Sequence, residues 1–342
     1  MNWRGGEKVL EALLLLFPRA DIYAHVVDES VKDQHLFGKS VRTTFIQSLP
    51  GAVNHYQKYL PLMPLALEQL DLREYDLVIS SESGPAKGVV TGPGTVHICY
   101  CHSPMRYVWD MYPDYLESSS FLTRLFMRPL IHYLKIWDRL SSDRVDHFIA
   151  NSTFVAERIQ KFYRRDAQVI HPPVDVSQFE VNEEKSDFYL VFGQLTEYKR
   201  ADLAVEAFLA NGKKLIVIGE GEQYKRLKAR ETENVRILGR LSNEQCRVYL
   251  SEARALVFPG VEDFGMVPVE AMACGTPVIA YAVGGALETV KEGVSGVLFH
   301  EQTVAALNEC LQRFESSVEK LDMQATRLHA AAFSTERFLR EI

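Results

Sequence analysis

Residues 259–280, PGVEDFGMVPVEAMACGTPVIA, contain the most informative pattern of the chain. An apolar strand pattern ends at Phe258, the loop after it carries Glu262, and Pro268 suits the first turn of a helix that Gly275 ends. A second strand pattern closes the stretch. Strand, loop, helix and strand in this order are typical of a parallel sheet covered by helices, and such sheets bind ligands at the carboxyl ends of their strands.

The same alternation of strand and helix patterns runs along the whole chain. It predicts an α/β fold of two doubly wound, Rossmann-like domains, because two sheets of this kind exceed what one small domain holds. Pro172 and Pro173 predict the link between them, since proline removes a backbone donor and stiffens an extended segment. The expected strands are residues 21–27, 43–47, 76–80, 96–101, 147–151 and 168–171, followed by 189–192, 214–218, 235–238, 255–258, 277–280 and 296–299.

The first domain lacks an expected strand. Gly5 and Gly6 precede a helix pattern from Glu7 to about Phe17, and a glycine-rich turn before a helix can bind phosphate. In a doubly wound sheet the strand before this turn is central, but only four residues precede Gly5. Its absence would leave two neighbouring strands with unpaired edges. Either the chain is truncated or the missing place is filled in another way.

Composition excludes several classes of protein. The 342 residues are 47% hydrophobic and 24% charged, with 45 acidic and 38 basic residues and a net charge of -7, which argues against binding to nucleic acid. The apolar run 13–17 is too short to cross a membrane, and the first residues lack the layout of a signal peptide, so a cytoplasmic chain is expected. Five cysteines without paired spacing are expected to be buried thiols: Cys99, Cys101, Cys246, Cys274 and Cys310.

Positive charge concentrates in residues 121–165, where nine lysines and arginines face four acids, a net of +5. A basic stripe forms there if the segment is helical, because its cations recur every three or four residues: Arg124, Arg128, His132, Lys135 and Arg139. Such a helix can lie on an anionic membrane, which would give peripheral membrane contact through residues 121–139. Alternatively its apolar side packs on its own domain and the cations are merely solvated. Pro129 is expected to split the helix.

The loop and helix of residues 259–280 also carry groups that suit a sugar nucleotide. Gly265 lets a backbone N–H approach a ligand closely, and the helix dipole favours an anion such as a diphosphate. Glu270, expected in the first turn of the helix, can accept hydrogen bonds from a ribose, and Glu262 can reach sugar hydroxyls. Acids that only complement the helix dipole would account for Glu270, but not for Glu262 and Gly265 together.

With these residues identified, the spacing of Glu262 and Glu270 resembles the donor-site signature of retaining GT-B glycosyltransferases of family 4. Residues 4–13, 172–175 and 195–204 resemble other conserved loops of that family. Residues 100–110, YCHSPMRYVWD, are similar to the mannosyltransferase branch that extends O-antigen and exopolysaccharide chains from GDP-mannose. The resemblance implies an acceptor-side domain over residues 1–173 and a donor domain over 174–330, facing a cleft. Residues 331–342 would begin a crossover helix that is curtailed.

The resemblance also implies roles for single residues. Glu262, His102 and Lys199 would be catalytic, with Lys199 on the donor diphosphate and His102 on the sugar hydroxyls. Gln194 stands where the family usually has an arginine, which weakens the bonding to a leaving diphosphate unless Arg200 compensates. The full set expected to bind the donor is Gly5, Gly6, Gln194, Lys199, Arg200, Arg240, Leu241, Phe264, Gly265, Met266 and Glu270.

The implied activity is transfer of mannose from GDP-mannose, with retention, to a lipid-linked or glycan acceptor in cell-surface glycan synthesis. No cofactor or metal is expected, since no D-x-D pattern stands where a metal ion could clamp the diphosphate. The enzyme would then work in the cytoplasm or on the inner face of the membrane. Two alternatives stay open: a sugar-nucleotide epimerase of the same architecture, and a truncated, inactive nucleotide-binding chain, for which the missing strand and Gln194 argue.

Overall fold

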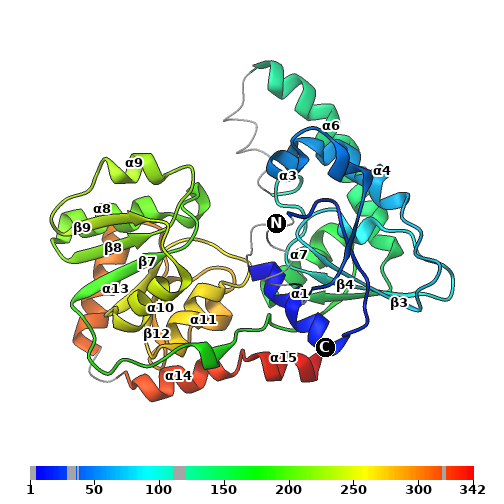
Figure 1. The fold of residues 1–342 in the computed structure, drawn as a ribbon. Coiled ribbons are helices and arrows are strands. Elements are labelled where there is room, and N and C mark those ends of the chain that lie inside the picture. Colours follow the sequence, from blue (N-terminus) through cyan, green and yellow to red (C-terminus); the bar gives the residue numbers. More distant parts are fainter. Residues whose placement is uncertain (1–4, 29–35, 37, 111–120, 318–320) are drawn as a thin grey trace. The chain divides into compact units, whose positions relative to one another are not determined.

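The computed structural model describes residues 5–28, 36, 38–110, 121–317 and 321–342, and the side chains of residues 121–123, 126 and 317 are not described. The chain divides into two units, residues 1–171 with Ile342 and residues 172–341 (Figure 1). The division falls at the link that contains Pro172 and Pro173.

The second unit is built on one six-stranded parallel sheet, with the order β9-β8-β7-β10-β11-β12. This is the order of a doubly wound sheet, in which the chain starts in the middle and builds outward in both directions. Its strands are β7 (Phe188–Phe192), β8 (Lys214–Ile218), β9 (Val235–Gly239), β10 (Ala255–Phe258), β11 (Val278–Tyr281) and β12 (Gly296–Phe299). Its helices are α8 (Ala201–Asn211), α9 (Tyr224–Lys228), α10 (Asn243–Glu252), α11 (Met266–Ala273), α12 (Ala286–Thr289), α13 (Val304–Ser317), α14 (Met323–Ala331) and α15 (Thr335–Glu341).

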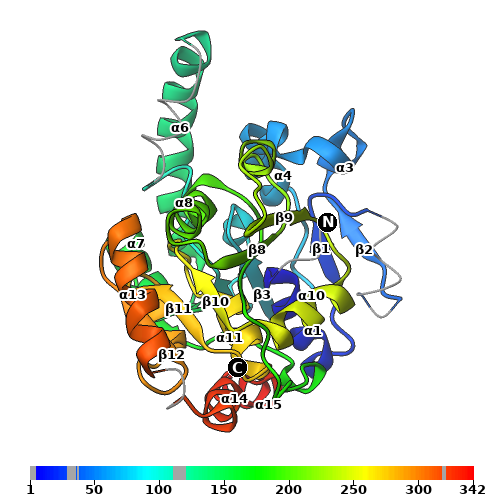
Figure 2. The same ribbon diagram turned by 90° about the vertical axis from the view of Figure 1, so that its left-hand side faces the viewer.

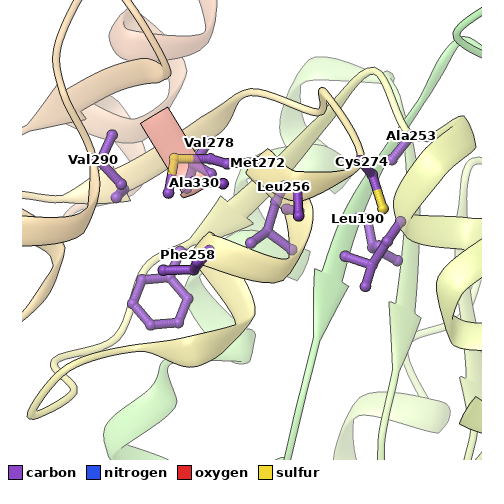
Figure 3. Close-up of a cluster of buried hydrophobic side chains, with 14 of the residues drawn as sticks. Leu190, Ala253, Leu256, Phe258, Met272, Cys274, Val278, Val290 and Ala330 are labelled. Atoms are coloured by element: carbon purple, nitrogen blue, oxygen red, sulfur yellow. The ribbon is translucent and has the colours of Figure 1, made fainter. Parts of the chain in front are cut away.

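Helices cover both faces of this sheet, because its strands are apolar on both sides. All four residues of β10 are buried. Leu256 and Phe258 of β10 pack with α10, α11 and α14 on one face, and Figure 3 shows part of this layer. Ala255 and Val257 pack with α8 and α13 on the other face. A strand buried on both faces favours an unbroken apolar run over an alternating pattern.

The first unit contains the remaining strands in two separate parallel sheets, β1-β2 and β3-β4-β5-β6. Its strands are β1 (Ile22–Ala24), β2 (Val41–Thr43), β3 (Leu77–Glu82), β4 (Val96–Cys101), β5 (His147–Ala150) and β6 (Ala167–Val169). Its helices are α1 (Gly5–Leu16), α3 (Ala52–His55), α4 (Met63–Glu68), α6 (Phe121–Ser141) and α7 (Thr153–Tyr163). In Figure 2, the turned view, α3, α4 and α6 lie at the same end of this unit, as they do in Figure 1.

The split between the two sheets falls where the sequence predicts a missing strand. Within the described residues, β1 pairs with β2 alone and β3 pairs with β4 alone. The two inner edges are linked by side chains near their starts, since Tyr75 donates to Asp21 and lies 3.1 Å from Tyr23, hydroxyl to hydroxyl. The fold class predicted from the sequence is therefore confirmed, and within the described residues no strand lies between β1 and β3.

Three local predictions were wrong. The strand expected at 43–47 is β2 at Val41–Thr43 followed by the 3-10 turn Phe45–Ser48, in which Leu49 N–H donates to Ile46. Short apolar runs fit either structure. Pro129 does not split α6, which is continuous; Pro129 and Leu125 are exposed, so the carbonyl that proline leaves unpaired faces water. The first helix begins at Gly5 rather than Glu7.

The five cysteines are buried free thiols, as predicted. Among the helices of the described chain, none combines the length and the apolar character that a membrane span requires.

A buried ionic cluster joins β3, α6 and α7 in the first unit. Lys87 is fully buried and pairs with Asp138 and with Glu82, whose Oε1 lies 3.5 Å from the Lys87 ammonium. Asp138 also accepts hydrogen bonds from Trp109 (2.7 Å) and Tyr163 (2.9 Å). The buried ammonium of Lys87 thus interacts with two buried carboxyl groups, those of Glu82 and Asp138. Burial raises the pKa of Glu82 from its usual 4.5 to about 7, against the opposing attraction of Lys87.

The raised pKa of Glu82 predicts a pH-dependent stability. A carboxyl whose pKa is higher in the folded state stabilises the fold most below pH 4.5, and this contribution is lost as the pH rises through about 7. Relative to Glu82→Gln, the free energy of unfolding of the wild type should fall by up to about 3 kcal/mol across this window. Urea unfolding of both proteins at several pH values measures this. Parallel pH profiles would contradict the assignment.

Candidate functional site

Two of the residues predicted to be catalytic meet at the centre of the second unit. Lys199 lies in the loop after β7 and Glu262 in the loop after β10, and these two strands are neighbours where the strand order reverses. The Lys199 ammonium lies 2.8 Å from Glu262 Oε1, with side chains 20% and 19% exposed. Both charged atoms can therefore touch one small molecule at the switch point of the sheet, the usual ligand position in such folds.

Glycines allow the Lys199 loop to approach this position. A Cβ at Gly260 would lie 2.5 Å from Lys199 Cα, so the two loops meet backbone to backbone and no side chain fits between them. A Cβ at Gly193, which has φ +142°, would lie 3.3 Å from the Lys199 ammonium. The sequence therefore fixes the position of Lys199 through two residues that carry no side chain.

A third loop holds the Glu262 segment from the other side. Gly285 N–H donates to Glu262 O at 2.9 Å, and a Cβ at Gly284 would lie 2.5 Å from the same oxygen. A Cβ at Gly285 would lie 2.3 Å from Phe264 Cα. The loop after β10 is thus held at Gly260 by the loop after β7 and at residues 262–264 by the loop after β11.

The helix after this loop, α11, begins at Met266 with Gly265 as its N-cap in the left-handed region, φ +85°. Glu270 is therefore in the second turn rather than in the predicted first turn, and its side chain is half-buried. The Phe264 ring is buried against Phe333 at 5.6 Å between ring centroids, so its side chain belongs to the core and does not face a ligand. The free N–H groups of the first turn suit an anion.

The structure separates the roles of the two neighbouring cations. Arg200 has φ +53° and caps α8, and its guanidinium contacts Asp202 Oδ1 at 3.2 Å and Gln302 Oε1 at 3.3 Å. Arg200 is thus held by Asp202 and Gln302, neither of which is a predicted site residue, whereas the acid that Lys199 contacts, Glu262, belongs to the predicted site. Gln194 is exposed in the same loop.

The predicted donor residues Arg240 and Leu241 lie on the loop after β9. A Cβ at Gly219, directly after β8, would lie 1.8 Å from Gly193 O, so the loops after β7 and β8 also approach each other through glycine. Gly239 has φ +74° and forms the turn that precedes Arg240 and Leu241. The Arg240 side chain is exposed, and Leu241 packs partly on the core. All of these loops follow the carboxyl ends of their strands.

A second group of predicted residues forms in the first unit. His102 follows β4, and its backbone N–H donates to Glu82 O at 2.7 Å while Asn151 donates to His102 O at 3.0 Å. A Cβ at Gly6 would lie 3.4 Å from His102 Nε2, so the glycines that begin α1 reach the half-buried imidazole. The structure thus brings Gly6 to His102 within this unit, and Gly5 precedes it at the start of α1.

Sequence reasoning missed Ser81 in this group. Its hydroxyl lies 2.9 Å from His102 Nε2, a hydrogen bond that fixes the orientation of the ring. Ser81 is on β3 and pairs in register with Tyr100 of β4. Its role depends on the pairing of β3 with β4. A serine within a strand pattern does not by itself indicate a functional residue.

Most of the 100–110 motif supports the architecture around His102. Trp109 donates to Asp138, and Arg158 of α7 donates to the Ser103 hydroxyl and to Asp110, both at 2.8 Å. These contacts anchor the loop after β4 to α6 and α7.

Comparison with known proteins places this geometry in a family. A model described as Glycosyltransferase Family 4 matches residues 3–178, and one described as Glycosyl transferases group 1 matches residues 175–327. The chain is similar to an uncharacterized glycosyltransferase of Methanocaldococcus jannaschii, with 31% identity over 169 residues, 48% of each chain. It is also similar to the O-antigen chain mannosyltransferase RfbU of Salmonella typhimurium, with 26% identity over 239 residues, 63% of this chain and 64% of that one.

A D-inositol 3-phosphate glycosyltransferase of Mycobacterium marinum is 29% identical over 226 residues, 57% of this chain and 48% of that protein. The chain spans about half the length of the first curated relatives that it matches.

Solved structures show the same fold over nearly the whole chain. Sucrose-phosphate synthase of Thermosynechococcus elongatus aligns with a TM-score of 0.72 and 20% identity over 97% of this chain and 89% of that one. HepE of Anabaena, in complex with UDP and glucose, aligns with a TM-score of 0.70 and 18% identity over 99% and 94%. Because the first family model alone covers more than half of the sequence and the second continues from it, the chain belongs to glycosyltransferase family 4.

Proposed function

We propose that this protein transfers mannose from GDP-mannose, with retention, to a lipid-linked or polysaccharide acceptor in cell-surface glycan synthesis. The observation that carries the proposal is the contact of Lys199 with Glu262 at the switch point of the second unit, 2.8 Å from ammonium to carboxylate. The two side chains offer one group for a phosphate and one for sugar hydroxyls.

Electrostatics support the role of Lys199. Its side chain is 20% exposed, and its ammonium contacts Glu262 in the loop that leads into the N-terminus of α11, where the helix dipole adds positive potential. A negative charge that grows on a leaving diphosphate would be stabilised there by groups that are already in place. Glu270 of α11 is proposed to accept from the ribose.

The proposed reaction needs no separate base in the protein. The acceptor hydroxyl oxygen bonds to the anomeric carbon on the face that the diphosphate leaves, and the bond from that carbon to the phosphate oxygen breaks. The proton of the hydroxyl passes to the departing phosphate. His102 is proposed to contact the hydroxyls of the transferred sugar, with Gly5 and Gly6 beside it.

Two observations support mannose as the sugar. Residues 100–110 resemble the mannosyltransferase branch, and a relative at 26% identity is an O-antigen chain mannosyltransferase. The complex of HepE with UDP and glucose supports a nucleotide sugar as the class of donor and leaves the base to experiment.

Lys199→Ala and Glu262→Ala should each lower transfer from radiolabelled GDP-mannose to lipid-linked acceptors by at least about a hundredfold. Loss of one preorganised group that stabilises transition-state charge costs about that much. The matched control is another lysine and acid of the same unit, Lys214 and Asp187, whose exposed charges lie 2.7 Å apart. Lys214→Ala and Asp187→Ala should keep wild-type turnover.

Unchanged turnover in Lys199→Ala or Glu262→Ala would remove that residue from the site. Release of a free epimer of the donor sugar without any acceptor would instead identify an epimerase.

GDP should raise the melting temperature more than UDP or ADP at equal concentration. At one hundred times its Kd a ligand stabilises the folded state by about 2.7 kcal/mol. Thermal shift on the wild type and on Lys199→Ala measures this, and the variant should lose most of the shift. If none of the three nucleotides changes the melting temperature, the chain is an inactive relative.

Ser81→Ala should lower kcat about fivefold to tenfold, with KM for the donor nearly unchanged, because one hydrogen bond that orients His102 is lost. Ser81→Thr keeps the hydroxyl and should restore most of the rate. Ser83→Ala, at an exposed serine two residues away, is the control. Equal rates for Ser81→Ala and Ser83→Ala would show that Ser81 does not position the imidazole.

A further inference from the structure

Helix α6 presents three different faces along its length. At about 100° per residue, its described side chains sort into a buried face, a basic stripe and an exposed apolar stripe. The buried face carries Ile131, Leu134 and Trp137, which pack in the core of the first unit. Trp137 also donates to Glu68 of α4 at 3.0 Å. This face fixes which sides of the helix point outward.

The basic stripe lies next to the buried face and spans roughly 80° of the helix. Arg128 and His132 are exposed in its middle. The other members are Arg124, Lys135, whose ammonium lies 5.9 Å from the Trp109 ring centroid, and Arg139, which pairs with Asp143 at 2.8 Å. The one acid of α6, Asp138, points into the buried ionic cluster. The basic stripe on the outer surface of α6 is therefore cationic.

The apolar stripe lies beside the basic stripe on the outer surface and is also roughly 80° wide. Leu125 is 58% exposed, Tyr133 46%, Ile136 49% and Leu140 59%. These residues fall on one line with Pro129, which is exposed as well. Single exposed apolar residues are common on proteins, whereas a continuous line of them along one helix marks an interaction surface.

A second set of exposed apolar side chains lies at the same end of the first unit. These residues belong to the segment around α3 and α4, which Figures 1 and 2 place at that end with α6. They are Phe45, Val53, Tyr56, Leu62 and Leu65, each between 37% and 50% exposed. Exposed apolar side chains at this end of the unit are therefore not confined to α6.

We propose that α6 docks the first unit on the surface of an anionic lipid bilayer, with its apolar stripe in the boundary between headgroups and acyl chains and its basic stripe against lipid phosphates. An apolar stripe with cations along its edge matches the layered chemistry of that surface. The row of cations favours an anionic lipid surface over a protein partner. A protein that covered only the apolar stripe would not require cations beside it. This surface is distinct from the groups proposed for sugar transfer.

Vesicle sedimentation of the full chain tests the proposal. The protein should bind vesicles of phosphatidylcholine with phosphatidylglycerol at least tenfold more strongly than vesicles of phosphatidylcholine alone, and salt should weaken the binding. Ile136→Ser with Leu140→Ser should weaken it at least tenfold, since both side chains are exposed and serine is about as compatible with a helix as isoleucine. Arg128→Gln should weaken it about fivefold, the effect of one cation near such a surface.

Matched controls come from the second unit. Leu287→Ser with Leu328→Ser removes two residues that are 57% and 75% exposed, and Arg226→Gln removes an exposed cation of α9. Both controls should bind vesicles like the wild type, and all variants should keep the wild-type melting temperature. Glu262→Ala should also bind normally, which separates docking from sugar transfer.

Three results would overturn the proposal. They are equal binding to neutral and anionic vesicles, wild-type binding by the α6 variants, and self-association without vesicles that Ile136→Ser with Leu140→Ser abolishes. The last result would assign the apolar stripe to a second copy of the chain.

Discussion

The candidate site depends on one constraint, the contact between the backbones of the loops after β7 and β10. A side chain at Gly260 would occupy the place of Lys199 Cα, so the presence of glycine there decides where the lysine stands. The sheet order brings these two loops together, because β7 and β10 are adjacent although more than sixty residues separate them. The ion pair of Lys199 with Glu262 follows from this topology and from three glycine-rich loops that leave no room for other arrangements.

The parts of the fold that the sequence predicted well are buried on both sides. Four strands have the bounds that apolar runs between turn residues predict: Val96–Cys101, Lys214–Ile218, Ala255–Phe258 and Gly296–Phe299. Residues 43–47 were mistaken for a strand because the apolar pattern of a short 3-10 turn is the same. The family resemblance supplied the pairing of Lys199 with Glu262, since their separation along the chain gives no indication of contact.

Other features required the three-dimensional structure. Ser81 reaches His102 only because β3 and β4 pair in register, and Glu82 and Asp138 share Lys87 only because α6 packs against the turn after β3 that carries this lysine. Likewise, the sequence of α6 contains more apolar residues than one face can hold, and it does not say which of them pack inward. Packing decides this, and it leaves Leu125, Tyr133, Ile136 and Leu140 outside.

The most direct test of the central claim is a crystal structure of the protein with GDP. We expect a terminal phosphate oxygen within hydrogen-bond distance of the Lys199 ammonium, the ribose hydroxyls at Glu270 and the base near the loop after β9. A nucleotide whose phosphates bind elsewhere, with the Lys199 ammonium out of reach, would contradict this expectation.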